Sequence, residues 1–360
     1  MKDSKNEIIN WSKNSILKVK IIISEMTCNF SIFGKFEKEA SCCLPVLIET
    51  ASLSLEFQKN LTQQDWFRKE DRSPVTVYDY VLQTYLVDAI TSQFPEDPII
   101  AEESLDGDID PKFISKIEET IKHKKFDLKK IFGKVSSCAP SKIGRFWVID
   151  PIDGTSGFKR KDGQFCIAIA LIENNESVFS AVAWPTQIPS LSGMLKAEPL
   201  FLLAARGHGS YYSTSSDPFN LNLVKVPQNL NDINNRQILP HGTRNENRMK
   251  KIAKNLNIPY SPIVCTSMCK GFSIAFGAAS YYIRAPFSDI EKNYDIAPFS
   301  MFVEEAGGIA TLGDGKKINF SNDGYVHGSE CGFLFSILGE QFHKKLVKEY
   351  SEAFELDLIE

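Results

Sequence analysis

Near the middle of the chain, residues 150–158 read DPIDGTSGF, two aspartates around a proline followed by a glycine-containing turn. An apolar run precedes this stretch at residues 146–149, and a second apolar run follows at residues 165–171. Short apolar runs bounded by turn residues are typical of buried strands. The pattern therefore predicts a strand, a turn and a second strand in a mixed sheet, with the acidic turn where the first strand reaches solvent.

The acidic turn suits a hard divalent cation. Magnesium prefers oxygen ligands in near-octahedral geometry, and the carboxylates of Asp150 and Asp153 can point at one spot, joined by the carbonyl oxygen of Ile152. Gly154 lets the backbone approach a bound anion, and the amides that follow can receive phosphate oxygens. Asp-Pro and Asp-Gly are also common turn dipeptides, so this stretch alone leaves a purely structural role open.

Three further carboxylates stand at the ends of expected elements. A short buried strand at residues 98–101 ends directly at Glu102, with Glu103 beside it. Asp79 falls in the first turn of an expected helix, and Asp295 opens another. We expect Glu102, Asp79 and Asp295 to face the acidic turn, whereas Glu103 also fits a solvated surface residue and is not chosen as a metal ligand.

Two of these acids have a structural alternative. Thr76 lies three residues before Asp79, which is close to the pattern of a capping box. Asp295 could equally cap a helix expected over residues 297–306, with Pro298 in its first turn. Helix capping alone would explain either acid without any chemistry.

The rest of the chain predicts a layered α/β protein. Helices are expected at residues 44–55, with Pro45 in the first turn, and at residues 78–90 and 270–279. Further strands are expected at residues 177–183, 200–204 and 281–284. Such alternation favours an α/β arrangement over a sandwich.

The length of 360 residues predicts two domains. The expected division is an N-terminal extension (1–38), an α+β metal-binding domain (39–213) and an α/β substrate-binding domain (214–360). Residues 104–143 read as an insertion with nine lysines, in which Asp110 and Pro111 begin a helix. Acidic residues interrupt the lysines, which favours a solvated helix over a nucleic-acid patch.

The amino-acid composition limits the classes of partner that we expect the protein to bind and indicates its cellular compartment. Hydrophobic residues make up 43% and charged residues 24%, as in ordinary globular proteins, and the formal charge of -4 provides no basic field for a nucleic-acid polymer. The eight cysteines form no CxxC pair, which favours buried reduced thiols over zinc. No apolar run approaches the ~18 residues that span a bilayer. We expect a cytoplasmic monomer with a small-molecule partner and no membrane contact.

Several segments together resemble a known family, the lithium-sensitive, magnesium-dependent phosphatases that include inositol monophosphatase, inositol polyphosphate 1-phosphatase and 3′(2′),5′-bisphosphate nucleotidase. The resemblance covers about residues 40–350 and is greatest for the nucleotidases. The segments that carry it are SPVTVYDY (73–80), FP (94–95), AEES (101–104), GRFW (144–147), DPIDGTSGF (150–158) and EAGG (305–308).

The resemblance implies a layered α-β-α-β-α fold with the active site between two domains and two or three bound Mg²⁺ ions. It implies hydrolysis of the 3′-phosphate of 3′-phosphoadenosine 5′-phosphate to AMP and phosphate, lithium sensitivity and a place in sulfur metabolism. It assigns the metal to Glu102, Asp150, Asp153, Asp295 and the carbonyl of Ile152, water activation to Asp79 and Thr155, and the substrate to Gly154, Thr155, Ser267, Lys270 and Arg284.

Two departures from the family keep alternatives open. The usual Trp-Asp-His-Ala-Ala-Gly reads YDIAPF at residues 294–299, and a lysine often found after the threonine is Ser156. A sensor of nucleotide or phosphate that has lost turnover is the alternative from another class. Among enzymes, the alternative substrate is an inositol phosphate or polyphosphate.

Overall fold

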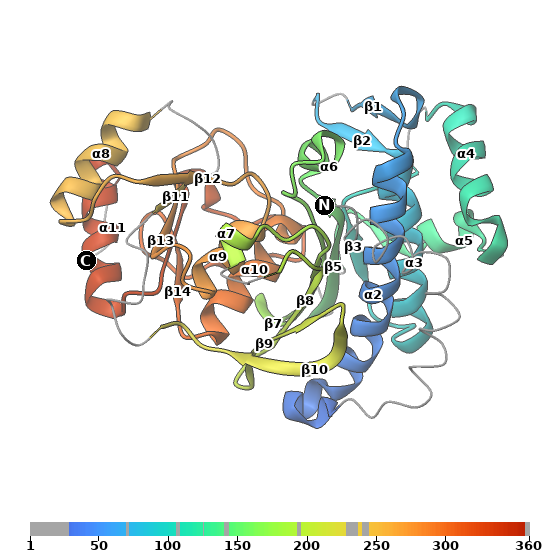
Figure 1. Cartoon of the computed structure of the whole chain (residues 1–360), viewed down its shortest axis with the longest axis horizontal. Coiled ribbons are helices and arrows are strands. Elements are labelled where there is room, and N and C mark those ends of the chain that lie inside the picture. The colour runs from blue at the N-terminus through green and yellow to red at the C-terminus, as the bar shows by residue number, and fades with distance from the viewer. Residues whose placement is uncertain are drawn as a thin grey trace.

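The computed structural model describes residues 29–69, 72–105, 109–124, 126–139, 144–192, 196–227, 237–239 and 245–356. In these residues two large β-sheets alternate with three layers of helices (Figure 1). A separate two-stranded sheet is formed by Trp66–Arg68 and Pro74–Thr76. The predicted α-β-α-β-α layering is confirmed.

The larger sheet has eight strands and carries the acidic turn. Its spatial order is β10-β9-β8-β7-β6-β5-β3-β4, in which β3 runs parallel to β4 and β5 and all other neighbours are antiparallel. The predicted mixed sheet is therefore confirmed. The strands are β3 (Ile99–Ala101), β4 (Val135–Ser136), β5 (Arg145–Asp153), β6 (Cys166–Glu173), β7 (Glu176–Trp184), β8 (Leu200–Ala205), β9 (Gly209–Thr214) and β10 (Asp217–Val224).

Helices α2 (Glu37–Asn60) and α3 (Val77–Gln93) cover one face of this sheet. The expected helix 78–90 is thus confirmed as α3. The expectation that Pro45 lies in a first turn was wrong, because α2 begins at Glu37 and Pro45 is inside it. Phe33 and Phe36, in the short helix η1 (Phe30–Phe36), are also buried in this core, so part of the expected extension 1–38 is core. Residues 1–28 lie outside the described residues.

The expected insertion packs against this first layer. Helix α4 (Pro111–Ile121) begins as expected, with the Asp110 side chain accepting from the amide of Lys112. Its apolar stripe, which includes Phe113 and Ile117, is buried beside α3, and α5 (Leu128–Phe132) follows it there. The insertion therefore enlarges the core, and only its outer face is solvated.

The smaller sheet has five strands in the order β12-β11-β13-β15-β14, with β11 parallel to β12 and β13 and the other pairs antiparallel. Strand β10, which follows the predicted domain boundary at residue 213, pairs with β9 in the first sheet. The division into two domains stays a prediction. The strands are β11 (Gln237–Leu239), β12 (Pro262–Val264), β13 (Tyr281–Arg284), β14 (Ile309–Leu312) and β15 (Phe333–Ser336).

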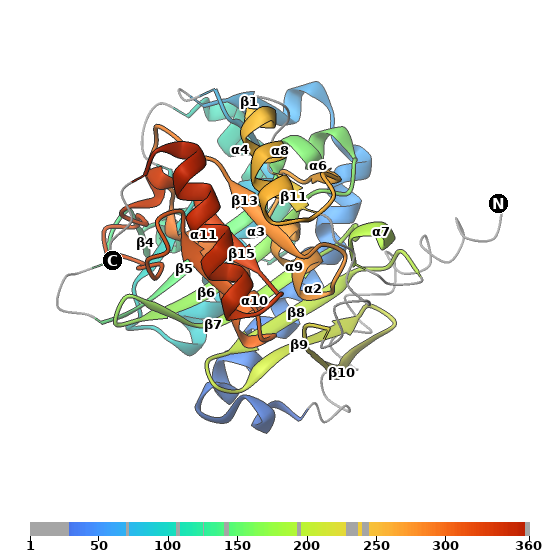
Figure 2. The ribbon, with the colours of Figure 1, turned by 90° about the vertical axis from the view of Figure 1, so that its left-hand side faces the viewer.

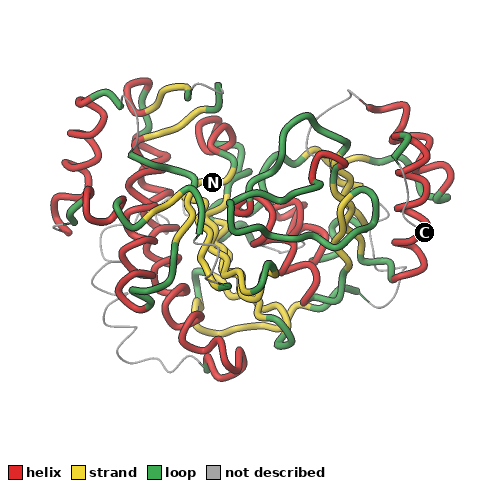
Figure 3. The backbone as a smooth tube through the Cα atoms, turned by 180° about the vertical axis from the view of Figure 1, so that it is seen from behind, coloured by secondary structure: helices red, strands yellow, loops and turns green. Residues whose placement is uncertain are grey.

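The remaining helices fill the middle and outer layers. Helices α9 (Cys269–Ala275) and α10 (Asn293–Glu305) lie between the two sheets and share one apolar core with both (Figure 3). Helices α8 (Glu246–Asn255) and α11 (Glu340–Phe354) cover the outer face of the smaller sheet, as the view onto that face shows (Figure 2). Helix α10 reaches from the middle layer toward β5, and this position brings Asp295 to the acidic turn.

Two expectations about environment need refinement. The segment Phe30–Asn60 is long and apolar enough to cross a membrane, although its apolar residues pack against the larger sheet as in a core helix. The described cysteines are all free thiols, but only Cys43, Cys166, Cys265 and Cys269 are buried, while Cys138 is exposed. The prediction that the cysteine thiols are buried was thus correct for only some of the described cysteines.

Candidate active site

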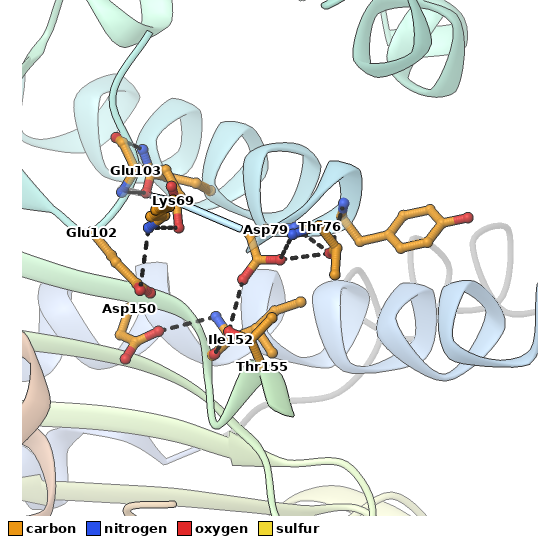
Figure 4. A network of polar contacts seen from close by, with 10 residues as sticks. Lys69, Thr76, Asp79, Glu102, Glu103, Asp150, Ile152 and Thr155 are labelled. Atoms are coloured by element: carbon orange, nitrogen blue, oxygen red, sulfur yellow. Dashed lines mark hydrogen bonds and ion pairs between the residues drawn. The ribbon is translucent and has the colours of Figure 1, made fainter. Parts of the chain in front are cut away.

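Asp79 is held at the start of α3 by the residue that precedes the helix. Thr76, the last residue of β2 (Pro74–Thr76), is the N-cap, and its amide and hydroxyl lie 2.8 and 2.5 Å from Asp79 Oδ2. The predicted capping box is therefore present. The other oxygen, Oδ1, lies 3.4 Å from the hydroxyl of Thr155 (Figure 4). Asp79 therefore takes part in the capping box of α3 and also lies in the candidate site.

Glu102 and Asp150 meet because their strands are parallel neighbours that end on the same edge of the sheet. Ala101 of β3 lies opposite Ile149 of β5, and the ladder continues with the Glu102 amide donating to the Ile149 carbonyl at 3.1 Å. Just beyond, the register of β5 shifts between Asp150 and Asp153. Asp150 and Asp153 both still pair with β6, so the shift bulges Pro151 and Ile152 out of the ladder. The Asp150 carboxylate accepts from the Ile152 amide at 3.0 Å.

Asp295 reaches the same edge from the opposite side. It lies in the first turn of α10, but Lys292 is the N-cap and no side chain caps this helix. The capping alternative for Asp295 was wrong, and Pro298 lies beyond the first turn. Phe299, one of the departures from the family pattern, is fully buried between the sheets. The altered neighbours of Asp295 thus contribute apolar packing.

The acids form two groups that fit a divalent cation. One ligand oxygen from each of Asp79, Glu102 and Glu103 lies within 4.8 Å of the others, and the same holds for Asp150, Asp153 and Asp295. Burial, with Glu102 nearby, raises the pKa of Asp79 to about 7. Burial and neighbouring carboxylates also raise the pKa values of Asp150 and Asp295 well above the usual range. Mg²⁺ prefers oxygen donors, and both groups offer only carboxylate oxygens, so these residues fit the metal.

Gly154 and Ser267 complete the turn in different ways. Gly154 has φ +87°, and a Cβ at this position would lie 2.5 Å from the Gln164 carbonyl oxygen, so only glycine fits. Ser267, expected to contact substrate, is fully buried, and its hydroxyl lies 2.7 Å from Asp153 Oδ2. The amide of Met268 donates to the same oxygen. In this structure Ser267 therefore orients a candidate metal ligand.

Lys270 and Arg284, the two cations expected to bind substrate, differ in their interactions with neighbouring residues. Lys270 is 6% exposed, and among the described residues its ammonium has no hydrogen-bond or ion-pair partner; it lies 5.1 Å from the Phe299 ring centroid. Burial opposes its charge, but Tyr282 and Asp153 outweigh burial and raise the pKa of Lys270. Arg284 forms an ion pair with Glu291. Lys270 is thus the cation available to an anionic ligand.

Sequence reasoning missed Lys69 and underrated Glu103. Glu103 is 2% exposed, and Lys69 Nζ lies 2.7 Å from its Oε1 and 3.5 Å from Glu102 Oε1. Gln83 of α3 clamps the Glu103 backbone through two hydrogen bonds of 2.6 and 3.0 Å. Glu103 therefore lies inside the site. In the sequence, this was indicated only by its position directly after Glu102.

A cleft of about 1210 Å³ opens beside this group, between the hairpin of β1 (Trp66–Arg68) and β2 and helix α4. Its lining includes Lys69, Glu102 and Glu103 together with the aromatic rings of Trp66 and Phe113. Glu102 and Glu103 are thus reachable from solvent on the side of the insertion.

Comparisons with known proteins agree with this arrangement. The model of the inositol monophosphatase family matches residues 44–353. A 3′(2′),5′-bisphosphate nucleotidase of Schizosaccharomyces pombe (strain 972) is 31% identical over 277 residues, which cover 70% of this chain and 77% of that protein. A nucleotidase of the same description from Dictyostelium discoideum is 30% identical, with 76% and 86% covered.

A solved structure has the same fold at lower identity. An IMPase/NADP phosphatase, solved in complex with Mg²⁺ and phosphate, is 18% identical and superposes with a TM-score of 0.56, covering 84% of this chain and 90% of that one. At this identity the likeness shows the fold alone.

Proposed function

Because the chain belongs to the inositol monophosphatase family, we propose that it is a magnesium-dependent 3′(2′),5′-bisphosphate nucleotidase that hydrolyses 3′-phosphoadenosine 5′-phosphate to AMP and phosphate. The observation that supports this most directly is the convergence of Asp150, Asp153 and Asp295 beside the Asp79–Thr155 pair. These residues come from strand β5 of the larger sheet, from the segment that follows it and from helices α3 and α10. Ordinary packing gives no reason to gather buried like charges.

The difficulty of the reaction explains why several groups are needed. Hydrolysis of a phosphate monoester requires up to ~10²¹-fold acceleration, whereas a general base supplies ~10²–10⁴. Mg²⁺, when bound by Glu102, Asp150, Asp153, Asp295 and the Ile152 carbonyl, would stabilise negative charge on the phosphate and on the leaving oxygen. Two or three ions are proposed, as the family resemblance implies.

The chain's own residues move the proton of the attacking water. The Thr155 hydroxyl lies 3.4 Å from Asp79 Oδ1 and 3.1 Å from the Ile152 carbonyl oxygen. When it donates to Asp79, its oxygen lone pairs are free to accept from water. Thr155 then holds the water, and Asp79 takes up the proton released as the water oxygen attacks phosphorus. The turn at Gly154 lets backbone amides approach the phosphate.

The second phosphate of the substrate requires cations away from the metal ligands, and we assign it to Lys270 and Arg284. Lys270→Ala is expected to raise KM for the bisphosphate ~10-fold or more, because hydrogen bonds to charged groups contribute about 1.5–3 kcal/mol. Arg284→Ala should act in the same direction but less, since Glu291 already pairs with Arg284. Steady-state kinetics with the bisphosphate and with adenosine 3′-monophosphate, which lacks the second phosphate, provide the comparison.

The substrate assignment is tested by phosphate release from a panel of nucleotides and inositol phosphates. Equal losses on both adenosine compounds in the Lys270 variant would show that Lys270 does not bind the second phosphate. A wild-type preference for inositol 1,4-bisphosphate would move the assignment to the inositol branch. Binding of the bisphosphate without any phosphate release would favour the sensor. Lys250→Ala is a matched control, since Lys250 is an exposed lysine on α8 paired with Glu246.

Lithium inhibition is a second expected property of the site. A small hard cation with a single charge can occupy a magnesium position without supplying the same charge stabilisation. We expect turnover to fall with added LiCl at fixed ionic strength and at constant MgCl₂, whereas NaCl has little effect. Identical titration curves for the two salts would argue against this property. A monomeric state, a cytoplasmic location and a place in sulfur metabolism stay predictions.

A further inference from the structure

In the part of the chain that the structure describes, two capping boxes pair a threonine with the aspartate three residues ahead, and the second of them adjoins the acidic groups. In the first, the amide and hydroxyl of Thr62 both lie 2.6 Å from Asp65 Oδ2. In the second, the same two groups of Thr76 lie 2.8 and 2.5 Å from Asp79 Oδ2. Each threonine therefore holds one oxygen of the aspartate three residues ahead.

The free oxygen of each aspartate has a different neighbour. Asp65 Oδ1 is paired with the ammonium of Lys116 on α4, which makes that box part of a structural contact between the insertion and the chain before β1. Asp79 Oδ1 faces the Thr155 hydroxyl instead, with Asp79 fully buried (Figure 4). The capping box of Asp65 therefore contributes to packing, whereas the capping box of Asp79 lies beside the residues that we propose to react.

The Thr76 contacts fix which oxygen of Asp79 is available. A carboxylate can rotate about its Cβ–Cγ bond, and this terminal torsion is broad in the absence of contacts. Two donors on Oδ2 hold the plane of the group in one orientation. Thr76 is itself fixed, because its hydroxyl accepts from the Tyr78 amide at 3.1 Å and the residue is fully buried.

We propose that Thr76 is a positioning residue for hydrolysis: its hydroxyl holds Asp79 Oδ2 so that Oδ1 stays aimed at Thr155. This inference rests on the proposed role of Asp79 and Thr155 in accepting the proton of water, and not on the identity of the phosphoester. The proton path is unchanged by Thr76, which neither gains nor loses a proton during turnover. Its contribution is alignment, and small misplacements of catalytic groups can cost about 10²-fold.

The test compares Thr76→Val with Thr62→Val, the matched change in the other capping box. Thr76→Val should lower kcat ~10- to 100-fold with KM changed less than about twofold, because alignment acts in the transition state. Thr76→Ser restores the hydroxyl and should recover kcat to within about threefold. Thr62→Val should leave both constants unchanged, while each valine variant lowers Tm by a few degrees through loss of a cap.

Two further variants separate positioning from folding. Thr76→Gly keeps a residue that caps helices nearly as well as threonine but has no hydroxyl, so it should fold and still lose kcat. In an Asp79→Asn background, Thr76→Val should cause no further loss, since both act through one carboxylate. Additive losses, unchanged kcat in Thr76→Val, or no rescue by serine would each overturn the inference.

These outcomes are distinguishable from failure of the proposed function. Kinetics are measured on whichever phosphoester of the panel the wild-type protein hydrolyses best. A preference for an inositol phosphate changes the substrate assignment while the effect of Thr76 remains measurable. If Thr76→Val hydrolyses the adenosine bisphosphate as fast as the wild type, only the inference about Thr76 is contradicted. If the wild-type protein has no phosphatase activity at all, both this inference and the proposed function are contradicted.

Discussion

Asp150→Asn is expected to lower kcat by about a thousandfold or more while the protein remains folded. Asp150 lies between the other acids of the site, with Glu102 on one side and Asp153 and Asp295 on the other, and their charges all act on it. An amide keeps the shape and the hydrogen bond from the Ile152 amide but removes the negative charge that holds a cation. Losing several kcal/mol of metal-based charge stabilisation corresponds to that factor.

The same substitution should not destabilise the metal-free protein, and thermal unfolding in EDTA provides the check. Asp150 is 2% exposed among like charges, so its neutralisation relieves repulsion. We expect Tm in EDTA to be equal to or above that of the wild type. Asp217→Asn, at an exposed position on β10, serves as the control with unchanged activity. Near-normal turnover of Asp150→Asn, or full wild-type activity in excess EDTA, would contradict the metal mechanism.

The position of a residue could be predicted from local sequence when the residue and the interaction that positions it lie in the same element. Asp79 is an example, because the capping box, the helix and the position of the acid all lie within residues 76–79. The strand before Asp150 and the turn at Gly154 were predictable in the same way, since a buried apolar run and a residue with positive φ leave a local signal. Helix α2 was placed too late because its apolar stripe begins before Leu44.

Contacts between distant segments were not predictable from one sequence. Lys69 reaches Glu103 because the β1–β2 hairpin folds over the end of β3, and no spacing in the sequence encodes that approach. Ser267 could be selected by family resemblance, yet its hydrogen bond to Asp153 depends on how α9 docks against the turn. The ion pair between Arg284 and Glu291 likewise depends on the position of the loop after β13.

The departures from the family around Asp295 lie in the apolar layer between the two sheets. Ile296 and Phe299 are buried there, and the Phe299 side chain also packs within 2.4 Å of where a Cβ on Gly271 would stand. Gly271 follows Lys270, so the close packing of α9 on α10 sets the position of the lysine relative to Asp295. Phe299 thus contributes to the contact between the two helices.

Binding of magnesium is expected to strengthen as the pH rises, and to release protons. Burial raises the pKa of Asp79 to about 7, and burial together with neighbouring acids raises the pKa of Asp150 and Asp295 well above the usual range. Without metal, the folded protein therefore binds more protons than the unfolded chain between about pH 4 and 7. A cation requires the ionised carboxylates, so each proton displaced contributes a tenfold change in affinity per pH unit.

The sign of the stability change follows from the same difference in bound protons. As pH rises through this window, the metal-free folded state must give up protons that the unfolded chain has already lost, and its free energy of unfolding falls. We expect a lower Tm in EDTA at pH 8 than at pH 6, and a larger rise in Tm on adding MgCl₂ at pH 8. Calorimetric titration of Mg²⁺ in two buffers of different ionisation enthalpy measures the protons released, and Asp150→Asn should release fewer. A metal-free Tm that increases from pH 6 to 8, or heats identical in both buffers, would show that these carboxylates are already ionised before the cation binds.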